Sequence, residues 1–297
     1  MQTLQNRWLA RLLALCMLLA ALPALAAPLG AAGLKARYDS LGPQLASNQF
    51  GGPLVLQSEE AQRRIDGSVY AVLDHPFAVV TGALVDPAQW CDILILHLNT
   101  KYCRRTEANG ETVLELRVGR KVEQDVDSAS LLRFGWRPPT KTADYFGIQM
   151  TAPEGPYGTR DYTLLVEAVP LPGNRTFLRM GYGLAYGTAS SIALQLYLGT
   201  AGRDKVGFTR QEPGAQGGED GFVGGMRGVV ERNTMRYYLA IDSYLRSLAA
   251  PPSERLEKRL ASWFDGTEKF PRQLHEVERD EYLQMKRNEV RRQAAAR

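Results

Sequence analysis

The sequence predicts an α+β fold in which a curved antiparallel sheet wraps around a long C-terminal helix. Residues 224–248 carry apolar side chains at three-, four- and seven-residue steps, the spacing of one helix face. Five earlier segments alternate apolar and polar residues, as strands do when one face of their sheet is packed. The helix cannot bury its apolar face alone, so these strands must supply the partner surface. The apolar stripe consists of Met226, Val230, Tyr237, Ile241, Tyr244 and Leu248.

The first 26 residues predict a secretory signal peptide. They contain two arginines, an apolar run over 12–22 and a small-x-small site over 24–26. We expect cleavage between Ala26 and Ala27 and a periplasmic location for the mature protein. The alternative is an uncleaved anchor helix, for which the apolar run is short.

The mature chain divides into three parts by pattern. An N-terminal extension covers 27–67, the main α+β domain covers 68–250, and a charged helical appendage covers 251–297. The extension opens with an expected short helix over 34–45 and carries no recognisable chemistry.

The main domain begins with an expected strand region over 68–84, which is apolar on both faces and interrupted at His75-Pro76. Asp86, followed by Pro87, then starts a helix, because an acid at the N-cap and proline at the first position favour helix initiation. This helix is apolar nearly all round, so it should be buried. The alternating strands that follow cover 114–118, 132–136, 146–150, 162–168 and 178–186.

Two cysteines remain after the leader, Cys91 and Cys103. A continuous helix would hold them about 18 Å apart, too far for a disulfide. If the helix ends near Asn99, the chain can fold back and close the bond, which the oxidising compartment favours. We therefore predict a disulfide, the alternative being a buried thiol near Trp90 and an exposed one.

The region between the last alternating strand and the long helix is less regular. Residues 190–199 favour a short helix over a strand, and 205–209 predict a last strand. The Gly-rich, acidic segment 211–225 is expected to be a loop that gates a cavity. Beyond the long helix, two charged helices are predicted over 253–264 and 271–292. On the long helix itself, opposite the apolar stripe, lie Arg232, Arg236, Ser243 and Arg246.

Charge and motif content argue against several classes of function. Without the leader's two arginines, 34 of the 36 basic residues remain, against 32 acidic ones. This nearly neutral balance gives no electrostatic reason to expect nucleic-acid binding. With three histidines in the chain, a multi-histidine metal site is not expected, and no cofactor motif is present. His97 lies on an apolar helix stripe and is interpreted as a satisfied core histidine. An enzyme would need an acid or base in the cavity, from His75, His97 or Glu167, and Glu167 is expected to face outward.

The expected elements over about 68–248 follow a fixed order. A strand comes first, then a helix that starts with Asp86, Pro87 and Trp90, then antiparallel strands and a long C-terminal helix. This order resembles the helix-grip fold of the START-like (SRPBCC) superfamily. The resemblance implies an apolar cavity between sheet and helix that holds lipids or other hydrophobic molecules. Fold alone does not decide between binding and catalysis, because some members are cyclases.

Three short phrases add to this resemblance. HPFA at 75–78, WCD at 90–92 and QLHE at 273–276 are similar to phrases of exported bacterial START-like proteins of undefined function.

Aromatic, methionine and amide side chains on the inward faces are the candidate ligand-binding residues. Buried rings with polar tips need hydrogen-bond partners, so such tyrosines favour a pocket over a dry core. We therefore expect non-catalytic binding of a hydrophobic small molecule or lipid, without a cofactor or metal, and transient contact with a membrane surface stays open. The alternatives are an envelope protein with a filled core that docks a partner through its appendage, and a cyclase-like enzyme. The candidates are Phe134, Trp136, Met150, Tyr162, Met180, Tyr182, Tyr186, Asn233 and Tyr237.

Overall fold

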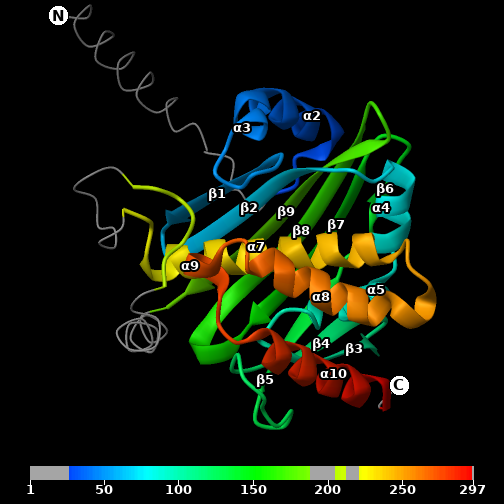
Figure 1. The fold of residues 1–297 in the computed structure, drawn as a ribbon, viewed down its shortest axis with the longest axis vertical. Helices are drawn as coiled ribbons and strands as arrows, with labels where there is room; N and C mark the ends of the chain where they lie inside the picture. Colours follow the sequence, from blue (N-terminus) through cyan, green and yellow to red (C-terminus); the bar gives the residue numbers. More distant parts are fainter. Residues whose placement is uncertain (1–26, 188–204, 212–220, 296–297) are drawn as a thin grey trace, which may run out of the picture.

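The computed structural model describes residues 27–187, 205–211 and 221–295 of the 297-residue chain (Figure 1). The leader over 1–26, the helix expected over 190–199 and most of the loop over 211–225 lie outside these residues, so those expectations stay predictions.

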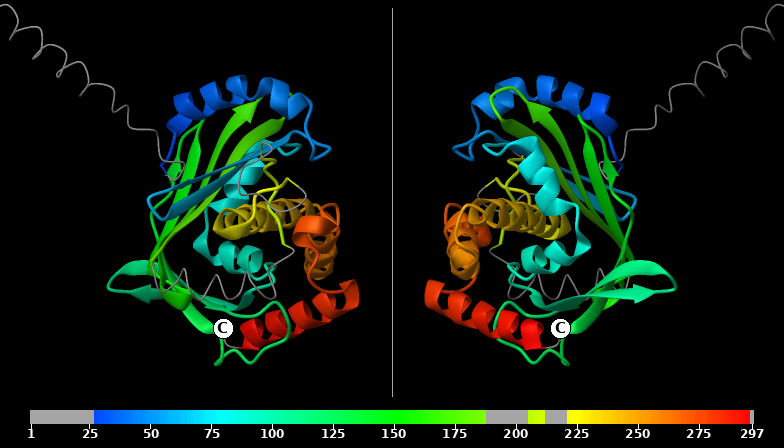
Figure 2. Two further views of the ribbon diagram at one scale, coloured as in Figure 1. Left: turned by 90° about the vertical axis from the view of Figure 1, so that its left-hand side faces the viewer. Right: turned by 90° about the vertical axis from the view of Figure 1, so that its right-hand side faces the viewer.

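A curved antiparallel sheet forms the body of the protein, and one long helix crosses its concave side (Figures 1 and 2). Within the described residues the sheet has nine strands: β1 (Leu54–Ala61), β2 (Arg64–Leu73), β3 (Thr100–Ala108), β4 (Glu111–Val118), β5 (Ser130–Trp136), β6 (Thr140–Lys141), β7 (Phe146–Glu154), β8 (Thr159–Leu171) and β9 (Arg175–Tyr186). Their order is β1-β2-β9-β8-β7-β5-β4-β3, and β6 pairs with β7. The long helix is α7 (Gly225–Ser247).

The alternation of the five predicted strands is confirmed. Inward residues such as Leu116, Phe134 and Leu164 are almost fully buried in the main apolar cluster. On the outer face Glu115 of β4 lies between Arg104 and Arg133 of its neighbours, with N–O distances of 2.6 and 2.9 Å. One face of β4 is therefore apolar and packed and the other is charged, as the period-two pattern requires, whereas β8 and β9 are buried on both faces.

β2 and α7 approach each other closely at a glycine. A Cβ on Gly67 would lie 2.5 Å from Oγ1 of Thr234 and 3.2 Å from a methyl carbon of Val230. Both contacts on α7 are fully buried. The missing side chain therefore fixes how near the helix lies to the sheet.

The strand region predicted over 68–84 is wrong in its second half. β2 ends at Leu73, and 77–84 form the helix α4 (Phe77–Leu84). Pro76 begins this helix, since its carbonyl accepts the first turn's N–H groups from Val79 and Val80 at 2.9 and 3.1 Å. Proline there starts a helix because its fixed φ and missing N–H suit a helix start.

The helix predicted at Asp86 and Pro87 is confirmed as α5 (Pro87–Leu94). Oδ1 of Asp86 accepts the N–H of Ala88 at 2.9 Å, which is the N-cap bond.

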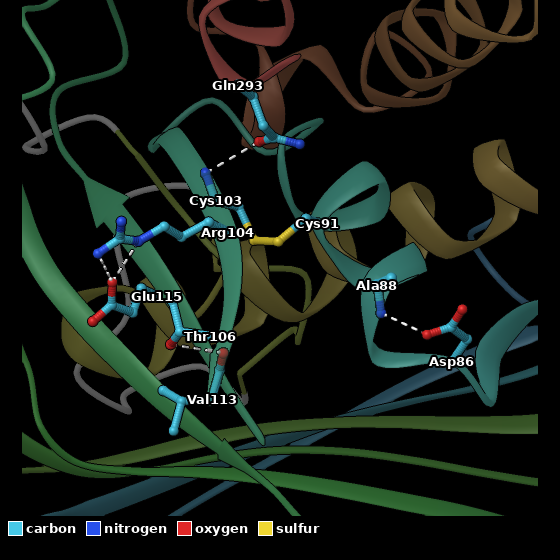
Figure 3. The surroundings of a disulfide bond; sticks show 9 residues. All are labelled: Asp86, Ala88, Cys91, Cys103, Arg104, Thr106, Val113, Glu115 and Gln293. Atoms are coloured by element: carbon cyan, nitrogen blue, oxygen red, sulfur yellow. Dashed lines mark hydrogen bonds and ion pairs between the residues drawn. A yellow bond between two sulfur atoms is a disulfide. The ribbon is translucent and has the colours of Figure 1, made fainter. Parts of the chain in front are cut away.

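The predicted disulfide is also confirmed (Figure 3). Cys91 on α5 bonds Cys103 on β3, and their Cα atoms lie 5.2 Å apart. The backbone N–H of Cys103 also donates to Oε1 of Gln293 at 3.1 Å, so the C-terminal helix packs beside this cross-link.

The N-terminal extension covers the convex side of the sheet with α2 (Gly30–Ser40) and α3 (Gly42–Ala46) (Figure 2). The extension also contributes β1 and the first residues of β2 to the sheet, which the sequence analysis did not predict. Residue exposure along β1 falls into a buried half and an exposed half instead of alternating, so no strand period was visible.

Glu167 faces away from α7, as predicted, but it does not meet solvent there. It is fully buried under the extension, where its carboxylate accepts the N–H groups of Leu29 and Gly30 at 2.7 and 3.0 Å. Arg179 donates to it at 2.8 Å, as does the hydroxyl of Tyr145. A charged pair on the convex face is thus enclosed by a segment more than a hundred residues away.

The C-terminal appendage consists of α8 (Arg255–Thr267), α9 (Pro271–Leu274) and α10 (Arg279–Ala295). α8 lies along α7, and α10 packs at the β3 end of the sheet (Figure 1). The predicted single helix over 271–292 is therefore broken. Glu276 lies in this break, and its carboxylate accepts a hydrogen bond from Nη2 of Arg236 at 2.7 Å.

The charged side of α7 is covered by this appendage and by the segment before the helix. Arg232 and Arg236 are 2% and 1% exposed. Arg232 donates to the carbonyl of Val206 at 3.1 Å, and the carbonyl of Arg236 accepts from Trp263 at 3.1 Å. Around Arg232 and Arg236 the polar face of the long helix is an interior surface, whereas Arg246 near the end of the helix is exposed.

The last strand predicted over 205–209 is wrong. These residues are irregular and are held to α7 by the buried carboxylate of Glu231, which accepts from Thr209 N and Oγ1 at 2.9 and 2.6 Å. Backbone bonds to Val223 add to this hold. The path of the segment is thus set by side-chain bonds to Glu231 together with backbone pairing to residues 221–223, where Arg210 and Phe222 form an isolated β-bridge.

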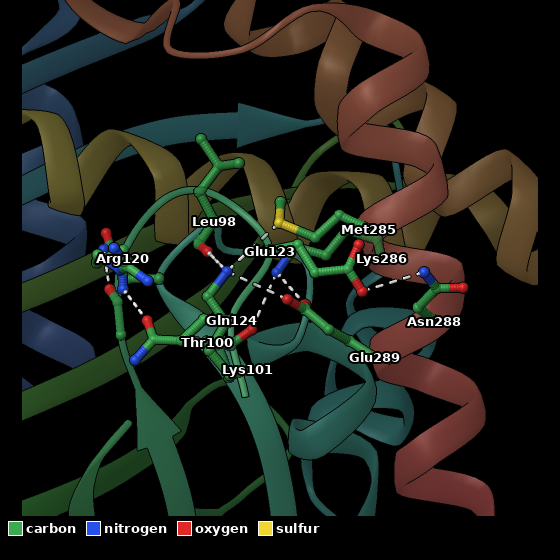
Figure 4. Close-up of polar contacts among 12 residues, drawn as sticks. Leu98, Thr100, Lys101, Arg120, Glu123, Gln124, Met285, Lys286, Asn288 and Glu289 are labelled. Atoms are coloured by element: carbon green, nitrogen blue, oxygen red, sulfur yellow. Dashed lines mark hydrogen bonds and ion pairs between the residues drawn. The ribbon is translucent and has the colours of Figure 1, made fainter. Parts of the chain in front are cut away.

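A buried charged cluster joins α10 to the chain after α5 (Figure 4). Lys101, Lys286 and Glu289 are all fully buried, and Glu289 accepts from Lys101 at 3.1 Å and from Lys286 at 2.7 Å. Nζ of Lys286 also donates to the carbonyls of His97 and Thr100, at 2.7 and 2.9 Å. Among the helices of the described residues, none is long and apolar enough to cross a bilayer.

Candidate functional site

A row of buried rings runs across the concave side of the sheet, from the end of α5 to β5. His97 stacks on Tyr237 of α7 with ring centroids 4.7 Å apart, and Tyr237 lies 5.2 Å from Tyr182 of β9. Tyr182 is 6.2 Å from Tyr162 of β8, which meets Phe134 of β5 edge to face at 6.4 Å. Residues from β5, β8, β9, α7 and the turn after α5 thus build one aromatic row between the sheet and the helix.

The structure brings most of the predicted ligand-binding residues together between the sheet and α7. Tyr186 packs at the margin of this group, and Asn233 is half-buried on α7. Trp136 and Met150 pair where β5 meets β7 through two residue pairs. The members inside the buried apolar cluster are Phe134, Trp136, Met150, Tyr162, Met180, Tyr182 and Tyr237.

The polar tips of the tyrosines have different surroundings. The hydroxyl of Tyr162 forms a hydrogen bond with Oγ1 of Thr159 at 2.6 Å, at the start of β8. The hydroxyl of Tyr186 bonds Glu60 on β1, so this residue serves the sheet edge. Asn233 lies beside Tyr182 and stabilises its ionised form. The hydroxyl of Tyr237 makes no hydrogen bond to another described residue.

Burial keeps these hydroxyls protonated. It raises the pKa of Tyr182 well above its usual value, and the neighbouring Tyr162 and Tyr237 raise it further while Asn233 lowers it. Burial also raises the pKa values of Tyr162 and Tyr237. The row therefore presents neutral hydroxyls, which suit a neutral or hydrogen-bonding ligand group and not metal ligation.

His97 lies at one end of the row and was underrated by sequence reasoning, which treated it as a satisfied core residue. Its side chain is buried, and Nε2 has no hydrogen-bond partner of ordinary geometry among the described residues, the nearby amide of Asn233 included. Burial lowers the pKa of His97 well below its usual value, and the charges of Arg236, Lys286 and Lys121 lower it further. The imidazole is therefore neutral at pH 7. An apolar stripe alone cannot show that one ring nitrogen is unsatisfied.

Cations gather around a single carboxylate behind His97. Glu276 accepts from Nζ of Lys121 at 2.5 Å and from Arg236 at 2.7 Å, with Lys205 at 3.8 Å. Burial raises the pKa of Glu276, but these cations outweigh it and the net shift is downward. Burial lowers the pKa of Lys121 to about 8. The environment of this end of the row is cationic.

Of the three candidate acid–base residues, the described part of the chain places only His97 in the row of rings. It contains no group of three or more His, Cys, Asp or Glu side chains placed to hold a metal ion. Glu167 lies on the opposite face of the sheet from α7 and is fully paired there. His75 lies in the turn between β2 and α4, where its carbonyl accepts from Thr176.

No protein-family model matches the chain, and no curated protein matches its sequence. Among solved structures, Ara h 8.0201 is 11% identical with a TM-score of 0.35, covering 65% of this chain and 99% of its own. The Zhui aromatase/cyclase from Streptomyces sp. R1128 is 14% identical with a TM-score of 0.30, covering 76% and 96%. Human StAR-related lipid transfer protein 5 is 11% identical with a TM-score of 0.28, covering 52% and 82%.

Such low similarities carry no argument about function, and the fold assignment rests on the architecture itself. A curved antiparallel sheet that grips a long C-terminal helix is what the sequence predicted, and it is what the described residues form. The fold is therefore a helix-grip fold.

Proposed function

We propose that this protein binds an apolar small molecule or lipid between its sheet and α7, in the periplasm, without catalysing a reaction on it. The observation that carries the proposal is the row of rings from His97 to Phe134. A purely structural core gains nothing from tyrosine hydroxyls, which must be hydrogen-bonded when buried. Here they border an apolar surface built by four elements and the turn after α5, as a ligand with one polar end requires.

Binding would be driven by burial of the ligand's apolar surface, worth about 25 cal/mol per Å² before the costs of ordering. The hydroxyls of Tyr162 and Tyr182 and the amide of Asn233 would orient the polar end. The predicted leader supports the periplasmic location, and so does the disulfide, because such bonds persist in oxidising compartments.

A larger side chain at Met180 separates an open pocket from a filled core. Met180 is fully buried on the inward face of β9, two residues from Tyr182. If the space is a pocket, Met180→Trp fills it, keeps the melting temperature and abolishes uptake of the apolar fluorophore N-phenyl-1-naphthylamine. If the core is filled, the extra volume lowers stability by about 1–3 kcal/mol. That result, together with no uptake by the wild type, would favour the structural envelope protein.

Phe177→Trp is the matched control, because Phe177 is fully buried on β9 but packs under α2 on the convex face. It should lower stability and leave fluorophore uptake unchanged. Tyr182→Phe and Asn233→Leu test the polar end. If both variants retain ligand and stability like the wild type, the assigned pocket is wrong.

A further inference from the structure

One ring nitrogen of His97 takes no part in the hydrogen bonds of the fold or in the apolar contacts of the proposed pocket. Its side chain is 2% exposed and its ring stacks on Tyr237. Nε2 has no hydrogen-bond partner of ordinary geometry within the described ranges, although the side chain of Asn233 lies near enough to raise the pKa of the ring. Buried polar atoms are nearly always paired, so an orphaned one at the end of an aromatic row points to a missing partner.

The hydrogen bond at the other ring nitrogen identifies which kind of partner is missing. Nδ1 of His97 accepts the backbone N–H of Asn99 at 3.1 Å. A neutral imidazole has one acceptor nitrogen and one donor nitrogen, so this bond assigns the proton to Nε2. Burial and neighbouring cations lower the pKa of His97, which keeps the ring neutral at pH 7. Nε2 is therefore a buried donor without an acceptor.

The ring is held in place by contacts on its own backbone. The carbonyl of His97 accepts the N–H of Thr100 at 3.0 Å and Nζ of Lys286 at 2.7 Å. Lys286 belongs to α10 and is fully buried with Glu289. The appendage thus fixes the position from which Nε2 donates, as a preorganised binding group needs.

The charges around His97 favour an acceptor that is itself negative. Arg236, Lys286 and Lys121 all act on the ring as positive charges. A hydrogen bond to an anionic oxygen is about twice as strong as one between neutral groups. An ammonium at the same place would meet both a donor and like charges.

We propose that the Nε2–H of His97 donates a hydrogen bond to the ligand's polar end, and that the ligand is an apolar chain or ring system ending in a carboxylate. This assignment rests on the proposed function, since it names the chemical class of ligand for that same pocket. It makes His97 a specificity-determining residue in addition to the predicted tyrosines.

Two substitutions at His97 separate its two nitrogens. Asparagine places an acceptor near the position of Nδ1 and so retains the bond from Asn99, but it lacks the distal donor. Glutamine places its amide N–H near the position of Nε2 and so retains the donor. N-phenyl-1-naphthylamine reports on the apolar pocket, and dodecanoate or dodecylammonium displaces it. The control is His75→Asn, at the turn between β2 and α4.

In the wild type and in His75→Asn, dodecanoate should displace the fluorophore at a concentration at least about tenfold lower than dodecylammonium does. His97→Asn should remove this preference by weakening dodecanoate about tenfold or more relative to the fluorophore, and His97→Gln should restore much of it. If dodecanoate and dodecylammonium compete equally in the wild type, or His97→Asn keeps the preference, the inference is overturned while the pocket stands. If neither fluorophore nor dodecanoate binds, the proposed function fails, and the inference with it.

A measurement on the unsubstituted protein guards against misfolded variants. The chain has three histidines, so ¹⁵N labelling of histidine gives a spectrum that can be assigned. The His97 signals should show the Nε2–H form, and adding dodecanoate should shift Nε2 while His75 and His275 stay unchanged. An Nδ1–H form, or no shift while dodecanoate displaces the fluorophore, would contradict the inference.

Discussion

The buried cluster of Lys101, Lys286 and Glu289 makes α10 dependent on a single carboxylate. Glu289 binds both ammonium groups, at 3.1 and 2.7 Å, and all three side chains are fully enclosed. Glu289→Gln keeps the shape of the side chain but leaves two buried cations without an anion. Removing one partner of a buried ion pair costs about 3–5 kcal/mol, and we expect a loss of that size in the free energy of unfolding at pH 7.

The pH dependence gives this prediction a second observable. Burial lowers the pKa of Lys286 to about 8 and lowers that of Lys101, although Glu289 raises both values. An unfolded lysine titrates near a pKa of about 10.4, so between these values the unfolded state binds more protons. Wild-type stability should therefore rise with pH across that window. In Glu289→Gln both lysine pKa values fall further, so the penalty should be largest at pH 7 and shrink by pH 9.5.

Urea unfolding followed by tryptophan fluorescence at pH 7 and pH 9.5 measures both effects. The matched control is Glu257→Gln, which breaks an exposed bridge from α8 to Arg287 of α10, and exposed bridges are worth about 0–1 kcal/mol. A loss in Glu289→Gln no larger than in this control, or a penalty that grows with pH, would refute the reasoning.

Three further perturbations test other parts of the fold. Reducing the disulfide should lower the free energy of unfolding by about 2–3 kcal/mol, measured by urea titration with and without reductant. An unchanged urea midpoint would show that the disulfide does not contribute to stability. Gly67→Ala should lower the free energy of unfolding by about 1–3 kcal/mol, because the added Cβ would lie 2.5 Å from Oγ1 of Thr234. Thr234→Ala in the same chain should recover part of this loss. If it recovers none, the strain does not come from this contact. Glu167→Gln should lower the free energy of unfolding by about 3–5 kcal/mol, since it removes the carboxylate that pairs with the buried Arg179. The N-terminal extension should then become sensitive to limited proteolysis. Tyr145→Phe, which removes one bond to the same carboxylate, should cost about 1 kcal/mol, and equal losses in the two variants would argue against a charge effect.

The sequence predicted those parts of the fold that depend on local periodicity. Strands such as β8 and β9, the stripe of α7 and the helix start at Asp86 all follow from residue spacing and cap chemistry. The disulfide followed from two cysteines and a helix end between them. These features need no knowledge of distant segments.

Features that depend on distant segments were missed. Arg236 on α7 and Glu167 on β8 stand at outward positions, yet the appendage and the extension cover them. Burial of such charges is set by partners far along the chain, which a periodic pattern does not contain. The unsatisfied Nε2 of His97 is of the same kind, because it depends on where Asn99 and Tyr237 lie in space.

The most direct test of the central claim is native mass spectrometry of the protein purified from its native cells, followed by solvent extraction. The account predicts a discrete added mass that extracts as an apolar molecule with an acidic end, and its loss in Met180→Trp. A bare protein mass under gentle conditions, with no uptake from a lipid extract, would contradict the claim that the space between sheet and α7 is a binding site.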